Sequence, residues 1–525
     1  MTKSKHGFSV TELTANKAKH LTRSPSFKKL TKEDLDYFYA ILPRDNILVA
    51  YNELGNNDEL LKHSTDWYNL FRGSPSAVLF PETTEQVSQL LTYCNKQHIA
   101  VVPQSGNTSA SGGSVPVFDE IIISLKKMNK IHSFDELKGD LICDAGCVLE
   151  DVDEYLLSFG YQFPLDLPSR HLCQIGGNIS TNAGGIRQMR FGNLHGNVTG
   201  LEVVTGEGTI INTLTTLRKD NTGYHLKNLF IGSEGTLAIV TKIAITTARL
   251  RQGINVFVFG FATFEQVVQA FSKAKKCLPE TISAFEVLDR ESIECVAQLG
   301  YQQPSNAVFP ISTQHNLYVI METAGTDPEY ENKKAIKFTE DLLKEGIALN
   351  GIVAKDEAEA TSFWSWRTML PRAIVQQGPS SIHFDISLPL PLLYQLVTDT
   401  RAWARENDMI GKDIHAIFGY GHVGDGNMHL SIPALRVDEE LRKTVDDFVY
   451  GWTSQYNGSI SAEHGIGLMK RSYLSYTKSR SSISSMRQIK DVFDPNGILN
   501  PYKLLPTEKE ENDGAIIRKR ADVGC

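Results

Sequence analysis

The chain has 525 residues, a formal net charge of -8 and a pI near 6.0. This length exceeds what one domain normally holds, so we expect two or three domains, and the acidic balance argues against generic nucleic-acid binding. No apolar run reaches the roughly 18 residues of a membrane span. The seven cysteines form no CxxC pair, which is typical of reduced intracellular thiols rather than of a disulfide framework.

The N-terminal segment is basic, with Glu12 as the only acidic residue before Glu33. Two interpretations are open: a solvated arm on a cytoplasmic protein, which we favour, and a mitochondrial presequence, which would place the protein in the matrix. At the other end, the charged tail from Glu508 to Cys525 is predicted to be disordered.

The first half of the chain mixes short strands and helices. Residues 1–72 are predicted to be polar and helical, with a helix start at Thr31. A helix at 85–96 places Val87, Leu90, Leu91 and Cys94 at helical spacing. A second helix is expected at 148–159, and strands are expected at 77–80, 99–103, 120–124, 141–143, 200–204, 209–211 and 237–241.

A second region begins near residue 250. Its apolar segments predict strands at 256–261, 284–288 and 316–322 and helices at 263–276, 333–344 and 439–452. Strand–helix–strand units with a strong apolar face indicate a sheet covered by helices. The fold class expected for the whole chain is therefore α+β.

Three segments rich in glycine and small polar residues lie at 102–113, 175–185 and 230–240. Successive backbone N–H groups in such a loop can form a concave site for a phosphate, and glycine lets the backbone approach a flat ligand closely. A flexible surface loop is the alternative for the first segment alone. Three such segments together favour a large cofactor that carries phosphate.

The run Gly419-Tyr-Gly-His-Val-Gly424 matches the GxGxxG pattern of dinucleotide-binding folds. That pattern requires a helix to begin after the glycines. Here a turn, Asp425-Gly-Asn, and an alternating strand-like run follow instead. We therefore reject the dinucleotide-binding interpretation.

The same region contains imidazoles and a carboxylate among glycines. His422 and His429 flank a Gly-rich turn, and Glu463 comes from a separate segment, a set that suits Zn²⁺ with positions open for substrate. Two hydrogen-bonded core histidines are the alternative, and Asp425 suits a turn better than a ligand position. Adjacent residues of an extended segment point in opposite directions, so His464 is expected to face away from the Glu463 site and to act as a general base.

Several motifs together resemble the FAD-linked D-2-hydroxyacid dehydrogenases of the vanillyl-alcohol-oxidase/p-cresol-methylhydroxylase (PCMH) superfamily, especially the D-2-hydroxyglutarate and D-lactate dehydrogenase branch. The resemblance covers about residues 20–505, and its motifs lie at 103–118, 164–168, 176–185, 217–224, 231–236, 419–430, 461–467 and 494–503. It implies a two-part PCMH-type FAD-binding domain, an α/β substrate cap domain and a C-terminal segment that returns to the FAD domain. The implied boundaries are 1–72 for an N-terminal helical segment, 73–250 for the FAD domain, 251–450 for the cap, 451–505 for the C-terminal segment and 506–525 for a tail.

The resemblance also implies roles for individual residues. A divalent metal, Zn²⁺ or alternatively Mn²⁺, is held by His422, His429 and Glu463, while His464 takes the proton of the substrate hydroxyl. Arg367, His383 and Asn427 are assigned to the substrate. Non-covalent FAD is assigned to Gln104, Ser105, Gly106, Asn107, Thr108, Gly176, Gly177, Asn178, Thr181, Asn182, Gly184, Gly185, Glu234, Gly235, Ile239 and Asn500.

The expected reaction is the oxidation of D-2-hydroxyglutarate to 2-oxoglutarate, with pyruvate or a redox protein as electron acceptor. The oligomeric state is left open, with a homodimer among the alternatives. A D-lactate dehydrogenase is the alternative enzyme, because His383 stands where many relatives have a lysine. A diverged paralogue without activity is the non-enzymatic alternative.

Two serines also depart from the family pattern. Ser105 and Ser109 replace glycines in the first Gly-rich segment. If either glycine used a positive φ, a serine there would cost roughly 1 kcal/mol. The sequence therefore predicts weakened FAD binding under that condition.

Overall fold

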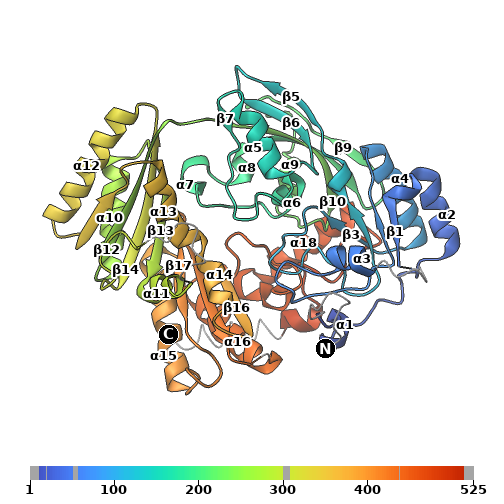
Figure 1. Cartoon of the computed structure of the whole chain (residues 1–525). Helices are drawn as coiled ribbons and strands as arrows, with labels where there is room; N and C mark the ends of the chain where they lie inside the picture. The colour runs from blue at the N-terminus through green and yellow to red at the C-terminus, as the bar shows by residue number, and fades with distance from the viewer. Residues whose placement is uncertain (1–10, 19, 51–56, 300–307, 437, 513–525) are drawn as a thin grey trace. The chain divides into compact units, whose positions relative to one another are not determined.

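The structure is a computed structural model that describes residues 11–18, 20–50, 57–299, 308–436 and 438–512 (Figure 1). The contacts between residues divide it into two compact units. Unit 1 contains the residues up to Gly184, Asn193–Arg249 and the segment that begins at Glu463. Unit 2 contains Gly185–Gly192 and Leu250–Ala462.

Unit 1 is built from short elements joined by many turns. They are α1 (Thr14–Lys17), α2 (Lys32–Ile41), η1 (Arg44–Asn46), β1 (Ile47–Val49), α3 (Asn57–Ser64), β2 (Ala77–Leu79), α4 (Thr84–Gln97), β3 (Val101–Gln104), β4 (Ile121–Ser124), η2 (Leu125–Lys127), β5 (Ile131–Asp135), β6 (Asp140–Asp144), α5 (Leu149–Leu157), β7 (Tyr161–Gln162), α6 (Ile175–Ser180), α8 (Leu194–Asn197), β8 (Val198–Thr205), β9 (Ile210–Asn212), α9 (Lys227–Phe230), β10 (Ala238–Thr246), β11 (Ala248–Arg249), η5 (Arg471–Tyr473), α17 (Leu474–Thr477) and α18 (Arg480–Phe493).

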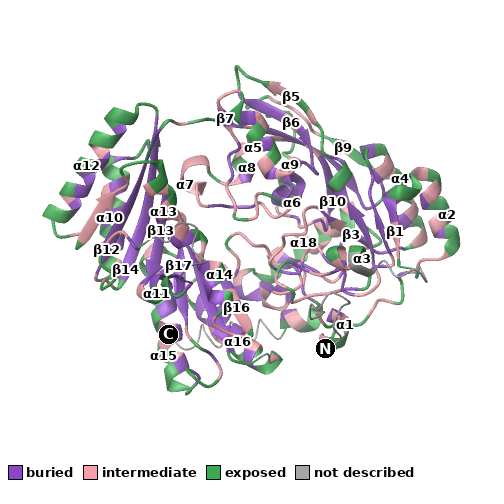
Figure 2. Ribbon diagram, viewed as in Figure 1, coloured by how far each residue is buried: buried purple, intermediate pink, exposed green. Residues whose placement is uncertain are grey.

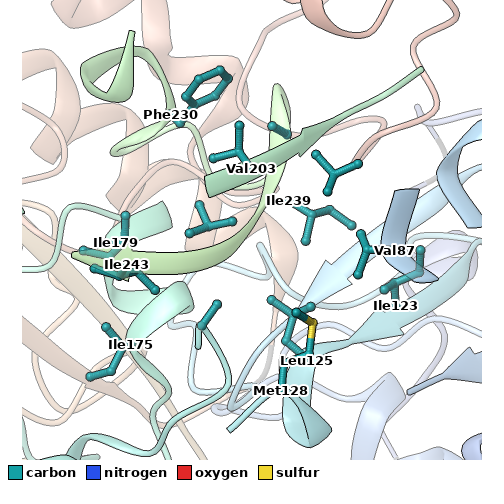
Figure 3. Packing of buried hydrophobic residues seen from close by; sticks show 14 of the residues in the cluster. Val87, Ile123, Leu125, Met128, Ile175, Ile179, Val203, Phe230, Ile239 and Ile243 are labelled. Carbon is teal, nitrogen blue, oxygen red and sulfur yellow. The ribbon is translucent and has the colours of Figure 1, made fainter. Parts of the chain in front are cut away.

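Two sheets organise unit 1. A four-stranded sheet has the order β1-β2-β4-β3, in which β4 runs parallel to β2 and β3. A five-stranded antiparallel sheet has the order β5-β6-β10-β8-β9. Figure 3 shows buried side chains of both sheets and of α4 and α6 in one hydrophobic cluster, which also contains Ile498 and Leu499 from the end of the chain. The C-terminal segment is therefore part of the core of unit 1.

Local sequence signals explain several of these elements. Helix α2 begins at the capping box formed by Thr31 and Asp34, as the sequence predicted. Helix α4 buries Thr84 together with the four residues that the sequence placed inward, which confirms that prediction.

Unit 2 contains longer elements. They are α7 (Gln188–Phe191), β12 (Gly253–Phe261), α10 (Phe264–Cys277), β13 (Ile282–Asp289), α11 (Arg290–Ala297), β14 (Leu317–Gly325), α12 (Pro328–Lys344), β15 (Asn350–Val353), α13 (Glu357–Thr368), α14 (Leu370–Val375), β16 (Ser380–Ser387), η4 (Leu390–Leu392), α15 (Gln395–Glu406), β17 (Phe418–His422), β18 (Asn427–Ala434) and α16 (Glu439–Gln455).

The centre of unit 2 is a seven-stranded antiparallel sheet with the order β15-β12-β14-β13-β17-β18-β16. Every residue of β13 and β14 is buried, as Figure 2 shows, because helices cover both faces. On one face, Phe257 and Phe259 pack against Phe338 of α12. On the other face, Val256 and Val258 join a cluster with residues of α13 and α14. The predicted sheet covered by helices is confirmed.

The two ends of the chain differ from the predictions. Thr14 and Phe27 are buried, and Arg23 pairs with Asp119 at 2.5 Å, so these residues belong to the folded unit rather than to a solvated arm. Residues 1–10 of the predicted arm lie outside the described residues. The predicted disorder of the tail is wrong for residues 508–512, which are helical, and Glu511 there is buried and pairs with Arg487 at 2.7 Å. The rest of the predicted tail, 513–525, lies outside the described residues.

No helix within the described ranges has both the length and the apolar character needed to cross a membrane.

Candidate active site

One face of the seven-stranded sheet gathers polar side chains. Residues opposite one another on paired antiparallel strands point to the same face. Glu286 of β13 lies opposite His422 of β17, while Tyr420 of β17 lies opposite His429 of β18, which lies opposite Asp385 of β16. The residues between them in each strand are apolar or glycine. The alternation therefore gives one polar face inside a buried sheet.

The two histidines of this face meet through the same ring atom. His422 Nε2 and His429 Nε2 are 3.3 Å apart, and both side chains are buried. Two nitrogens bound to one tetrahedral Zn²⁺ at the usual bond lengths would be roughly 3.3 Å apart. The donor set and its spacing therefore fit one divalent metal ion, and the strand–turn–strand geometry that presents them confirms that the Gly419–Gly424 run opens no helix.

Glu286 fixes the orientation of one of these rings. Its Oε1 accepts a hydrogen bond of 2.5 Å from His422 Nδ1, and its Oε2 accepts one of 2.9 Å from Arg367 Nε. Burial raises the pKa of Glu286, but His422 and Arg367 outweigh burial and hold this pKa below its ordinary value. An ionised carboxylate only accepts hydrogen bonds, so His422 donates its Nδ1–H to Glu286. Glu286 belongs to none of the sequence motifs, since only the strand register brings it to His422.

Arg367 is buried on α13, so it is not an ordinary helix-surface arginine. Its guanidinium lies over the ring of Tyr420, with 4.8 Å between the guanidinium carbon and the ring centroid. Its Nε bonds Glu286, and among the described residues no acceptor forms a hydrogen bond with its two Nη groups. The forked end of Arg367 can therefore bind a carboxylate.

Asp385 is a second carboxylate that the sequence analysis did not assign. Its Oδ1 lies 3.9 Å from His429 Nδ1 and accepts a hydrogen bond of 3.0 Å from Asn427 Nδ2. Asn427 Nδ2 also donates to the carbonyl of Ile386 at 3.2 Å. The amide group of Asn427, which was predicted to bind substrate, thus holds the strand that carries Asp385.

His383 lies on the same face, two residues before Asp385. Its Nδ1 is 3.0 Å from Ser431 Oγ, and that hydroxyl is 3.2 Å from the hydroxyl of Tyr420. His383 is therefore tied into the row of side chains that contains Tyr420.

The segment that carries Glu463 and His464 is bent rather than extended. His464 Nε2 and Glu463 Oε1 are 3.5 Å apart, so the prediction that the two side chains point in opposite directions was wrong. The bend follows a strand-like stretch in which Ala462 N donates to the carbonyl of Asp385 at 3.1 Å. Glu463 is the next residue along the chain.

The turn after His464 is held by two residues of the Gly-rich segments. Glu234 accepts hydrogen bonds of 2.7 Å from the backbone N–H groups of both Ile466 and Gly467. Ser111 Oγ donates to the carbonyls of His464 and Gly465 at 3.2 and 3.3 Å. Glu234 thus positions the turn that carries His464, a role that the sequence did not suggest for this predicted cofactor residue.

The first Gly-rich segment presents unpaired backbone donors. In the part of the chain that the structure describes, no acceptor bonds the N–H groups of Ser105, Gly106, Asn107 or Thr108. Asn107 has a left-handed φ of 53°, and its side chain bonds the carbonyls of Lys62 and Thr65 at 3.0 and 2.9 Å. Gln104 bonds the carbonyls of His63 and Ser114, both at 2.8 Å. A loop fixed from its sides with free N–H groups fits the phosphates of FAD.

Neither serine that departs from the family pattern strains this loop. Ser105 and Ser109 are absent from the residues with positive φ, which rules out the backbone cost that the sequence analysis considered. Ser109 Oγ instead accepts hydrogen bonds from Ser111 N and Gly113 N at 3.3 and 3.2 Å.

The second segment is not a loop throughout, because its first residues form helix α6. A Cβ on Gly106 would lie 2.1 Å from the carbonyl oxygen of Leu172, and one on Gly176 would lie 2.6 Å from the Ala145 Cβ. Close packing within unit 1 therefore explains these two glycines. Ile239 belongs to the hydrophobic core cluster of unit 1 (Figure 3). The remaining predicted FAD residues of this segment lie in α6 or in the stretch that follows it, namely Gly177, Asn178, Thr181, Asn182, Gly184 and Gly185. Gly235, from the third segment, lies in the turn before β10.

A buried cluster connects the third segment with the end of the chain. Asn500 Nδ2 donates to the carbonyls of Gly113 and Glu234 at 2.9 and 2.8 Å, and its Oδ1 accepts a hydrogen bond of 2.6 Å from Lys503 Nζ. Burial lowers the pKa of Lys503 to about 7, although Glu120 and Glu234 raise it. No sequence motif pointed to Lys503, because its burial depends on contacts between distant segments.

Comparisons with known proteins agree on a flavoprotein. The FAD binding domain family matches residues 75–214, and the C-terminal domain of FAD linked oxidases matches residues 250–504. A D-2-hydroxyglutarate–pyruvate transhydrogenase of Saccharomyces cerevisiae is 44% identical over 94% of this chain and 99% of its own length. A mitochondrial D-2-hydroxyglutarate dehydrogenase of Arabidopsis thaliana is 42% identical over 93% of this chain and 84% of its own length.

The fold is also found in solved structures. That of p-cresol methylhydroxylase with bound substrate has a TM-score of 0.69, covers 91% of this chain and 98% of its own, and is 17% identical in sequence. At this identity the similarity shows the fold alone.

Proposed function

Since the chain belongs to the family of FAD-linked D-2-hydroxyacid dehydrogenases, we propose that it oxidises D-2-hydroxyglutarate to 2-oxoglutarate. The observation that carries this proposal is that Arg367 bonds Glu286, which lies on the sheet face where His422 and His429 meet. A buried arginine with free Nη groups can bind a carboxylate. Two Nε2 atoms at metal-ligand spacing can hold a metal ion that would bind the α-hydroxyl beside that carboxylate.

The cofactor FAD, bound without a covalent link, would accept the hydride from C2 of the substrate. The free N–H groups of residues 105–108 would hold its phosphates. The rest of the cofactor would contact the other predicted residues, which are those between Gly176 and Gly185 together with Glu234, Gly235 and Asn500. Glu234 and Asn500 already bond backbone groups of unit 1, which supports a shaping role for both.

A divalent metal, Zn²⁺ or alternatively Mn²⁺, would polarise the hydroxyl and the carboxylate of the substrate. We assign His422 Nε2 and His429 Nε2 as ligands, together with Glu463, which directly follows a residue bonded to β16. His464 would accept the hydroxyl proton, and the bonds of Glu234 and Ser111 to its turn would keep its imidazole in place.

The two carboxylates of the substrate need separate partners. Arg367 would bind the carboxylate next to the hydroxyl, and His383 would lie toward the distal carboxylate. Asn427 uses its amide donors on β16, so only its Oδ1 is left to accept a hydrogen bond from substrate.

D-lactate is the alternative substrate. The observation that favours it is that His383 lies on this sheet face, bonded to Ser431, at the position where many relatives have a lysine, since an imidazole lacks the fixed charge of a lysine. The name of the yeast relative suggests pyruvate as the electron acceptor, with a redox protein as the other candidate.

Anaerobic mixing of the FAD-loaded protein with a panel of D-2-hydroxyacids tests the proposal. We expect D-2-hydroxyglutarate to bleach the flavin fastest and the L-enantiomer to leave it oxidised. Faster bleaching by D-lactate would establish the alternative, and bleaching by none of the acids would refute both.

For the cellular location, we propose the cytoplasm, because Thr14, Arg23 and Phe27 are packed into unit 1 and a cleaved presequence could not include them. The Arabidopsis relative is named mitochondrial, so the matrix is the alternative. Fractionation with an antibody to the C-terminal region distinguishes the two locations.

A further inference from the structure

Glu286 is a carboxylate at the centre of a sheet strand that is otherwise mostly apolar. Its side chain has no exposed surface, and it lies on β13 between Phe285 and Val287. A buried carboxylate is strongly destabilising unless charged or polar partners satisfy both of its oxygens. Its presence here therefore calls for a reason other than packing.

Each oxygen of Glu286 has one partner. Oε1 accepts the hydrogen bond from His422 Nδ1, and Oε2 accepts the one from Arg367 Nε. The two partners come from β17 and α13, which are separate elements of unit 2. One carboxylate thus connects a proposed metal ligand with the proposed substrate-binding arginine.

We infer that Glu286 is the positioning residue of the site, which holds His422 for the metal and Arg367 for the substrate carboxylate at the same time. This inference rests on the proposed function for the identity of metal and substrate. It adds a residue that the motifs do not contain and a physical connection between two binding events.

The effect on His422 follows from hydrogen-bond chemistry. With Nδ1–H donated to the carboxylate, the neutral form of the ring has its lone pair on Nε2, which faces His429 Nε2 at 3.3 Å. A carboxylate behind a metal-bound imidazole also increases its basicity, and loss of such a partner typically costs 10–100-fold in metal affinity.

The effect on Arg367 is geometric. Because Nε donates to Glu286 while the guanidinium lies over the ring of Tyr420, two separate contacts restrict the orientation of the fork. Without Glu286 the fork would lose both its orientation and its neutralising charge.

Glu286→Gln tests the inference with almost no change in volume. The amide has one acceptor and one donor, so it cannot accept hydrogen bonds from His422 Nδ1 and Arg367 Nε with separate oxygens. We expect a Zn²⁺ dissociation constant raised about 10–100-fold, measured by competition with a chromophoric chelator, and a higher KM for D-2-hydroxyglutarate. The FAD content should not change.

Glu322→Gln is the matched control. Glu322 is a buried carboxylate on the neighbouring strand β14, and it pairs with Arg187 at 2.9 Å rather than with a histidine. It should lower stability without changing the Zn²⁺ dissociation constant. Equal Zn²⁺ affinity in wild type and Glu286→Gln would overturn the inference, as would an equal loss in the control.

Glu286→Asp is the second test variant, to be used if Glu286→Gln does not fold. It keeps the charge but is one methylene shorter, so it should retain only one of the two contacts and recover only one of the two functions. Full retention of both metal affinity and KM in this variant would contradict the positioning role.

A metal-free readout separates this inference from the proposed function. In apo protein labelled with ¹⁵N-histidine, the His422 signals, assigned by comparison with His422→Gln, should report a proton on Nδ1 in wild type and a loss of that preference in Glu286→Gln. If wild type binds no metal, the proposed function fails, while the tautomer result still decides for or against Glu286.

Discussion

Glu234 is predicted to act on the reaction through the turn of His464 rather than through FAD affinity. In the wild-type protein the backbone N–H groups of Ile466 and Gly467 each donate to a separate oxygen of Glu234 at 2.7 Å. In Glu234→Gln only one acceptor oxygen is left for these two N–H groups. Two charge-assisted hydrogen bonds of about 1.5–3 kcal/mol each are replaced by one neutral bond of about 0.5–1.5 kcal/mol. The turn therefore loses about 2–5 kcal/mol of stabilisation.

A loss of this size is enough to let the turn sample other positions. A misplacement of about 1 Å can cost roughly a hundredfold in rate, so kcat per bound FAD should fall at least about tenfold. FAD affinity, measured by fluorescence titration, should change less than about threefold, because the N–H groups of residues 105–108 stay intact. This change is well below the 1.4 kcal/mol that corresponds to tenfold.

Two companion variants complete this test. Ser111→Ala removes the hydroxyl that bonds the carbonyls of His464 and Gly465, so it should lower kcat in the same direction. Glu202→Gln changes a buried carboxylate of unit 1 that bonds Thr84 and Lys242, and it should leave kcat per FAD unchanged. The reasoning is refuted if Glu234→Gln loses FAD while the remaining holoenzyme turns over at the wild-type rate.

Three further predictions concern single residues. His422→Ala and Glu463→Ala should each abolish bound metal, measured by elemental analysis, while FAD stays bound; wild-type metal content in either variant would reject that ligand. His383→Lys should shift the kcat/KM ratio toward D-2-hydroxyglutarate over D-lactate by about ten- to a hundredfold, since it adds one charge-assisted bond; an unchanged ratio would place His383 outside the substrate pocket. Lys503 has a folded-state pKa of about 7, below its unfolded value near 10.4. The unfolded chain therefore binds a proton between these two pH values that the folded protein does not, so the free energy of unfolding should rise with pH across this window and be insensitive to Lys503 below it. Denaturant unfolding of Lys503→Met should show a smaller rise, and an identical pH profile would mean that Lys503 keeps an ordinary pKa.

The sequence predicted those features that depend on local periodicity. Helix α4 and its inward residues follow from apolar residues three and four apart, and the strand after Asp425 follows from strict alternation. The motifs also indicated which histidines would meet, because both lie on one hairpin, where β17 and β18 pair directly.

Features that depend on register between distant strands were not accessible. Glu286 is separated from His422 by 136 residues, and only the pairing of β13 with β17 makes them neighbours. Lys503 needs the return of the C-terminal segment to Gly113 for its burial. The orientation of Glu463 and His464 was mispredicted because extended geometry was assumed where Ser111 and Glu234 hold a bend.

The central claim is that the two-histidine site and FAD act in one oxidation of D-2-hydroxyglutarate. Its most direct test is single-turnover reduction of the flavin by this acid in three samples: the protein as purified, the protein after metal chelation, and the chelated protein after Zn²⁺ is returned. We predict fast bleaching in the first sample, a loss of at least about a hundredfold in the second, in line with the several kcal/mol that a metal contributes as a Lewis acid, and recovery in the third. Equal bleaching rates in all three samples would contradict the account.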